Sequence, residues 1–207
     1  MSEPSYPLTM PTTPNFVTSQ WEIIKTVAVT QSPFTYASNV HEYDGAVWNT
    51  IVTLPSLSRS QAGAWQSFFM QLHGRKGTFL MGDPDAKTIT GGATTIISVN
   101  GDHSVGAFDI VVDNCDTSTV VFKQGDYVQF GSGSSSKLHM IVSDVTSDSS
   151  GNATLPIEPP LKTALSDDAV ITYSDTKAVM RMDSNDLGWK ANKTSLYSFS
   201  FSCTEAL

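Results

Sequence analysis

The chain has 207 residues, a formal net charge of −8 and a pI near 4.7. Charged residues make up 15% of it, below the roughly 25% of an average globular domain, so Ser, Thr, Asn, Gln and Gly must supply much of the polar surface. A nucleic-acid binder needs a basic footprint, yet the largest cluster of Lys and Arg is Arg75-Lys76. The composition therefore argues against nucleic acid and anionic membranes as direct partners.

The N-terminal segment, residues 1–17, carries four prolines and no hydrophobic period. Such a segment predicts an extended arm that is either disordered on its own or laid over a neighbouring subunit. It lacks the cationic start and apolar run of a signal peptide, and no apolar run approaches the length of a membrane span. We therefore expect a protein that is assembled in a cytoplasm.

Three β-strands are predicted next, at residues 21–31, 35–43 and 46–55, because the first segment is rich in β-branched residues and the other two end at Asp44-Gly45 and Pro55. The first strand ends at Ser32-Pro33. Asp44-Gly45 separates the second from the third, and this dipeptide between two apolar runs is a strong hairpin signal. The sequence thus predicts that the chain reverses at Asp44-Gly45.

A single amphipathic helix is predicted over residues 58–73. Ser58 and Gln61 have the spacing of a capping box, and the following apolar stripe has helical spacing. Its members, which we expect to form core contacts, are Trp65, Phe68, Phe69 and Leu72. Gly74 stands where a left-handed helix end is favoured. The motif HGRKG (73–77) is therefore interpreted as a helix stop, since a phosphate site requires glycines before a helix.

Beyond Pro84 the composition changes to short apolar runs separated by Gly, Ser and Asp turns. Six strands are predicted between residues 88 and 175, which suggests a small β barrel. Near the C-terminus, SLYSFSFSC alternates, with Leu196, Phe199 and Phe201 as core candidates. The predicted fold class is mainly β: a split β barrel or sandwich with one packed helix, formed by residues 18–87 and 176–207, and an inserted small barrel, residues 88–175.

No catalytic, cofactor or metal site is predicted. His41, Glu42 and Asp44 are metal-ligand types, but alternate residues of a strand point to opposite faces, so their side chains should diverge. The group Asp144, Asp148 and Asn152 lacks the spacing of a calcium loop and reads better as a hairpin turn.

The two cysteines and the histidines add no catalytic signal. Cys115 and Cys203 form neither a disulfide framework nor a zinc pattern, and we expect two unpaired thiols. His73, His103 and His139 have no nucleophile partner in a recognisable motif, and no G-x-S-x-G occurs. The sequence thus gives no positive reason to expect an enzyme.

The order of parts from VWNTIVTLP through SQAGAWQSFF and GRKGTFLMGDP to the closing YSFSFSCTEA resembles the distal tail and minor tail-tip proteins of long, non-contractile-tailed bacteriophages. The stretch QGDYVQFG to LPIEPPL resembles the inserted barrel, of the oligonucleotide/oligosaccharide-binding type, found in some of these proteins. The likeness spans residues 18–207, while the Pro-rich arm departs from the family pattern.

The resemblance implies a structural role in the virion tail tip, without catalytic residues or cofactors. It implies a homo-oligomeric ring, commonly a hexamer, assembled in the host cytoplasm. Its expected partners are the tail tube protein, the tail-tip hub protein, the tape measure protein and receptor-binding fibres.

An alternative is a carbohydrate-binding β module at the same tail tip. Sugar binding requires exposed aromatic platforms on one face. The candidate sugar-contact aromatics are Tyr127, Tyr173 and Trp189. A hydrolase would instead need a pair of carboxylates in a cleft.

Overall fold

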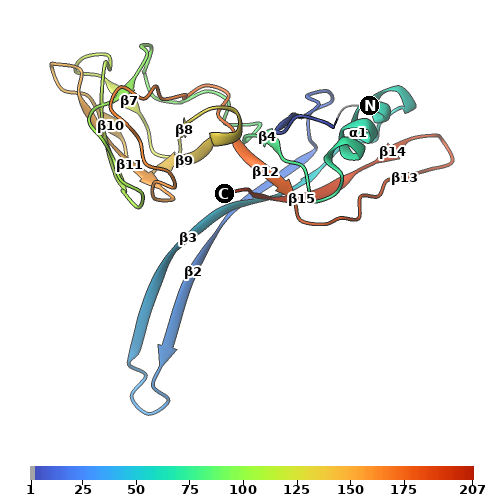
Figure 1. Cartoon of the computed structure of the whole chain (residues 1–207), viewed down its shortest axis with the longest axis horizontal. Coiled ribbons are helices and arrows are strands. Elements are labelled where there is room, and N and C mark those ends of the chain that lie inside the picture. Colours follow the sequence, from blue (N-terminus) through green and yellow to red (C-terminus); the bar gives the residue numbers. More distant parts are fainter. Residues whose placement is uncertain (1–2) are drawn as a thin grey trace.

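The computed structural model describes residues 3–207, apart from the side chain of Asp44, and is mainly β with one α-helix in that range (Figure 1). The first half contains β1 (Leu8–Thr9), β2 (Thr18–Gln31), β3 (Ser38–Thr53), α1 (Arg59–Leu72), β4 (Phe79–Met81), β5 (Ser98–Val99) and β6 (Asp109–Asp113). The second half contains β7 (Val120–Phe122), β8 (Tyr127–Phe130), the 3₁₀ turn η1 (Gly133–Ser135), β9 (Lys137–Ile141), β10 (Val145–Thr146), β11 (Ala153–Glu158), β12 (Ala178–Met182), β13 (Lys190–Ala191), β14 (Tyr197–Ser198) and β15 (Ser200–Glu205).

A curled six-stranded sheet has the strand order β1-β4-β12-β15-β3-β2. Only the β1–β4 pair is parallel. Strands β12 and β15, from the end of the chain, thus lie between β4 and β3, from its beginning. The segments on either side of residues 88–175 thus contribute strands to one sheet.

Helix α1 covers one face of this sheet through its aromatic stripe. Trp65, Phe68, Phe69 and Leu72 are all buried. The Phe69 ring lies 5.2 Å from that of Phe201, centroid to centroid, and the Phe68 ring lies 5.4 Å from that of Phe79. The helix therefore supplies three of the aromatic side chains of the first hydrophobic core.

The helix ends are set by the residues that the sequence singles out. The Gln61 side chain accepts a hydrogen bond from the Ser58 backbone N–H at 3.1 Å, half of the predicted capping box. At the other end the left-handed turn begins at His73 (φ 51°), one residue before the predicted Gly74 (φ 67°). The Gly77 N–H then bonds the Leu72 carbonyl, so the HGRKG motif closes the helix.

The prediction of a chain reversal at Asp44-Gly45 is wrong. Strand β3 runs straight through this dipeptide, and the chain reverses at Ser32–Ala37, where the Ser32 N–H bonds the Ala37 carbonyl at 2.9 Å. Lys25 pairs with Ala46 but Val27 pairs with Glu42, so three residues of β3 lie opposite Thr26 alone. Asp44-Gly45 therefore forms a β-bulge, which changes the register and twist of the ribbon instead of ending it.

A second hydrophobic core lies within residues 97–171. Its five-stranded sheet has the order β5-β6-β11-β9-β8, and β7 pairs with β10 beside it. The predicted strand at 169–174 contributes only isolated bridges, at Val170 and Thr172, and β7 was not predicted. Two residues of this region, Tyr127 and Leu138, belong instead to the first core.

One core residue predicted near the C-terminus, Leu196, is not buried. Leu196 is 37% exposed, whereas Phe199 and Phe201 are buried. Strand β14 pairs with β13 in a small separate hairpin, and β15 begins only at Ser200, so the alternation restarts between the two strands. Of the two strands, only β15 shows the predicted alternation of buried and more exposed side chains.

Candidate functional site

The most conspicuous feature of the surface is the distal part of the β2–β3 hairpin, which projects away from the rest of the molecule (Figure 1). Every residue of β2 from Ile24 to Gln31 is exposed, and no described residue of β3 before Ala46 is buried. At the turn, Phe34 is 92% exposed and Tyr36 is 75% exposed. Within this part of the chain, the two strands are paired with each other over their whole length and with nothing else.

The two faces of this ribbon differ in chemistry. Val29 lies directly opposite Val40, and Val27 is two residues along β2 from Val29, so the three valines share one face. They are 63%, 59% and 45% exposed for Val29, Val40 and Val27 respectively. The opposite face carries Thr30, paired with Asn39, and Ala28, paired with His41. Glu42, opposite Val27, lies at the edge of this valine face. The hairpin thus has one mainly apolar face, which is uncovered within the described chain.

The Pro-rich arm lies over its own chain, so the expectation of a segment that is disordered alone is wrong for residues 3–17. Strand β1 pairs with β4, and Leu8, Met10 and Phe16 pack against the first core. The Tyr6 hydroxyl donates to the Gln71 carbonyl at 2.8 Å. The arm is therefore fastened both to the sheet and to α1.

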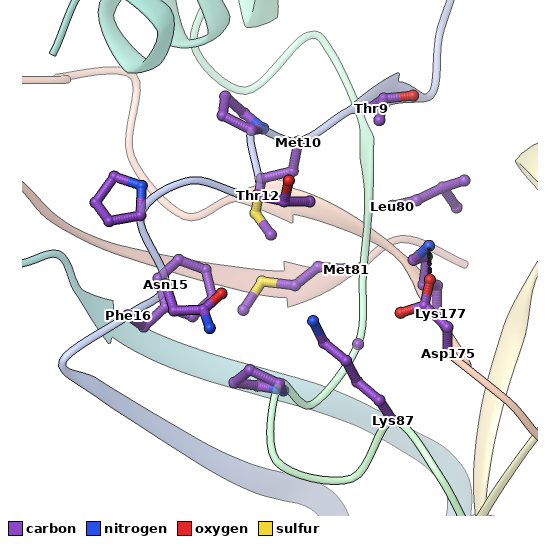
Figure 2. Close-up of a pocket in the computed structure, with 14 residues that line it drawn as sticks. Thr9, Met10, Thr12, Asn15, Phe16, Leu80, Met81, Lys87, Asp175 and Lys177 are labelled. Carbon is purple, nitrogen blue, oxygen red and sulfur yellow. Dashed lines mark hydrogen bonds and ion pairs between the residues drawn. The ribbon is translucent and has the colours of Figure 1, made fainter. Parts of the chain in front are cut away.

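A cavity of about 180 Å³ lies between the arm and β4. Figure 2 shows Met10, Phe16 and Met81 around it, with the ammonium group of Lys87 directed inward and the Lys177–Asp175 ion pair (2.7 Å) at one side. The lining is largely apolar, and the lysine of the pair is already neutralised. Sites for polar substrates have several convergent polar groups, which this cavity does not present.

The three aromatics proposed as sugar contacts are not brought together. Tyr127 is buried, with its ring 5.8 Å from that of Trp48, and burial raises its pKa to about 12. Tyr173 is half-buried and donates to the Thr95 carbonyl at 2.5 Å. Trp189, 38% exposed, lies beside Phe199, at the first core. These residues occupy separate places and form no common platform.

The polar clusters serve local structure. The Asp148 carboxylate accepts hydrogen bonds from the backbone N–H groups of Ser150 and Asn152 and from the Asn152 amide, and these bonds lower its pKa. Asp144 accepts from the Gln124 N–H. The loop is a hydrogen-bonded turn, as the sequence favours over a calcium site.

The His41 and Tyr43 rings contact each other on one face, with their centroids 4.6 Å apart, as expected of alternate residues in a strand. The side chain of Asp44 lies outside the described part, so the predicted divergence of the ligand types stays a prediction. Among the described residues, no three His, Cys, Asp or Glu side chains are grouped to hold a metal ion. In the same part of the chain, no helix is both long and apolar enough to cross a membrane.

Three further titratable groups, Cys115, Cys203 and His139, are buried. Cys115 and Cys203 are free thiols in different cores, and burial raises the pKa of both, that of Cys115 to about 11. His139 is fully buried; its Nδ1 lies 2.7 Å from the Pro159 carbonyl oxygen, and burial lowers its pKa to about 4. His73 ends the helix, and Nε2 of His103 accepts from the Val111 N–H. None of these groups faces a nucleophile across a cleft.

Comparison with known proteins adds no assignment: no protein-family model and no curated protein sequence matches this chain.

Proposed function

We propose that this chain is a structural virion protein, a subunit of the distal tail ring of a long, non-contractile-tailed bacteriophage. In this role it joins the tail tube to the tail-tip hub and the receptor-binding apparatus. It acts through shape and contact, not through catalysis. The sequence resemblance suggests the role, and the β2–β3 hairpin is the structural observation that supports it best.

A two-stranded ribbon is at best marginally stable alone in water, and large exposed apolar patches mark interaction sites. Here the apolar face formed by Val27, Val29 and Val40 is uncovered, and Phe34 and Tyr36 are exposed to solvent at the turn. A second protein surface over this face would stabilise the ribbon. The simplest occupant is the neighbouring copy in a ring, because ring contacts join one patch to a different patch of the next subunit.

The exposed aromatics at the turn would add area to such a contact. A standard interface buries about 800 Å² on each partner. Aromatic side chains contribute about 150–250 Å² each when fully buried, so Phe34 and Tyr36 supply a substantial part of that area. The three valines extend it along the ribbon.

The amphipathic ribbon allows a matched test by mass photometry and negative-stain microscopy of the purified chain over a range of concentrations. Val29→Glu places a charge on the apolar face, and Thr30→Glu places the same charge one residue along, on the polar face. We expect rings from the parent and from Thr30→Glu, and monomers from Val29→Glu.

Both substitutions lie on exposed positions, so circular dichroism should show the same fold for all three proteins. Persistence of the parent as a monomer at high concentration, together with its absence from virions, would refute the ring. Glycan-array binding by that monomer would then favour a carbohydrate-binding module.

A further inference from the structure

The inserted segment, residues 88–175, meets the six-stranded sheet through a short stretch of chain, Glu158–Lys162. Lys162 forms an ion pair with Glu205 of β15, and their side chains are only 8% and 0% exposed. Glu158 forms a second pair with Lys25 of β2 at 3.0 Å, with about a third of each side chain exposed. The insert thus supplies one anion and one cation, and the sheet supplies their opposite partners.

Neighbouring contacts surround the buried Lys162–Glu205 pair. The Trp48 N–H donates to Oε2 of Glu205 at 3.2 Å, and the Trp48 indole donates to the Leu138 carbonyl of the insert at 2.9 Å. Nζ of Lys137, also in the insert, donates to the Ala206 carbonyl at 2.9 Å. Burial lowers the pKa of Lys162 and Glu205 opposes this decrease, so the two charges depend on each other.

We propose that the two ion pairs form an orientation lock that fixes the insert at one angle to the six-stranded sheet. Apolar contacts alone are non-directional and tolerate rotation of one body on another. The opposite polarity of the two pairs removes that tolerance. A reversed docking would place Glu158 near Glu205 and Lys162 near Lys25, and juxtaposed like charges strongly disfavour a wrong arrangement. The inference concerns the single chain and does not depend on the proposed ring.

The test is a distance distribution between the two bodies, measured by pulsed electron–electron resonance. Ala64→Cys in α1 and Thr154→Cys in β11 provide exposed labelling sites on regular elements. The natural Cys115 and Cys203 are buried thiols with raised pKa values, so they should not take up the label. For the labelled parent we expect one narrow distribution.

The decisive variant is Lys162→Met combined with Glu205→Gln, which removes both buried charges and keeps an acceptor for the Trp48 N–H. Replacing both members of a buried pair is often tolerated, so the fold should survive while the distribution broadens at least twofold. Lys76→Met is the matched control, because Lys76 and its ion-pair partner Glu3 both lie outside the insert, and the distribution should stay narrow.

A narrow, unshifted distribution in the neutral double variant would overturn the lock and assign the orientation to the apolar contacts. If that variant fails to fold, Lys25→Met decides the question. The Lys25–Glu158 pair is partly exposed, so its loss leaves no buried charge. An unchanged distribution in Lys25→Met would equally overturn the proposal, and broadening would support it.

Discussion

Single aromatic residues carry much of the first core. Phe69 is 4% exposed, and its ring lies within 6 Å of the rings of Trp65, Phe68, Phe199 and Phe201. Interiors are packed as densely as organic crystals, so a deleted ring leaves a void that neighbours fill only in part. Phe34, by contrast, is 92% exposed at the hairpin turn. The same residue type therefore has opposite roles at the two positions.

Phe69→Ala is expected to lower the free energy of unfolding by about 3–5 kcal/mol, because it combines lost burial with a cavity. Phe34→Ala is the control and should change it by less than about 0.5 kcal/mol in the monomer. Urea unfolding followed by tryptophan fluorescence measures both. Equal losses in the two variants would contradict the assignment of Phe69 to the core.

A second residue-scale prediction concerns acid stability. The pKa of buried His139 is lowered to about 4, from an ordinary value near 6.5. Below pH 6.5 the unfolded chain binds a proton that the folded chain does not, so stability falls as the pH decreases towards 4. Between pH 7 and pH 5, the proton taken up by this residue in the unfolded chain should lower the free energy of unfolding by on the order of 2 kcal/mol.

His139→Gln should reduce that pH dependence, although it lowers stability at pH 7. His41→Gln, at an exposed position, should leave the stability at pH 7 nearly unchanged. Urea midpoints for the three proteins at pH 5, 6 and 7 provide the comparison. An identical slope in the parent and in His139→Gln would show that His139 is not held neutral by the fold.

At the scale of elements, the β2–β3 hairpin has two different halves. Its proximal half, including Trp48 and Val52, contributes to the first core and pairs with β15. Its distal half pairs only with itself beyond the bulge at Asp44-Gly45. The bulge thus separates a part of the ribbon that packs on the core from a part that does not. The distal half should unfold locally more often than the proximal half, since few buried contacts hold it in place.

In the monomer, backbone amides of residues 27–43 should exchange with deuterium much faster than those of α1 and β15. If the hairpin docks on a neighbour, the same amides should become at least tenfold slower in the assembled ring. The exposed turn η1 (Gly133–Ser135) is an internal reference that should stay fast. Unchanged exchange of the hairpin in the ring would place the subunit contact elsewhere.

At the scale of the whole molecule, two cores share one boundary. The second core draws all its buried residues from within residues 97–171. The boundary is not clean, because Tyr127 and Leu138 project into the first core. The insert therefore has a core of its own, and excision would expose an apolar patch that the sheet now covers.

We expect residues 88–175 to fold alone and to give a dispersed amide NMR spectrum, since their strands pair mainly among themselves. Leu138→Ser sharpens this test. In the intact chain this substitution should lower the free energy of unfolding by about 2–5 kcal/mol, because Leu138 is fully buried there. In the isolated insert it should leave the free energy of unfolding nearly unchanged and improve solubility. A collapsed spectrum for both forms of the insert would contradict independent folding.

The sequence by itself determined the parts whose signals are local. Helix α1 was predictable because its cap, its aromatic stripe and its stop all lie between Ser58 and Gly77. The mainly β class followed from β-branched runs and turn residues.

Only the tertiary structure decided the features that depend on distant partners. Asp44-Gly45 has the composition of a turn, but pairing with β2 on both sides turns it into a bulge. Leu196 continues an alternating pattern, yet the β13–β14 pairing leaves it partly exposed. Lys162 and Glu205 are 43 residues apart and give no signal in the sequence. Their pairing arises because folding removes both charges from water at one place, where each is stable only beside the other.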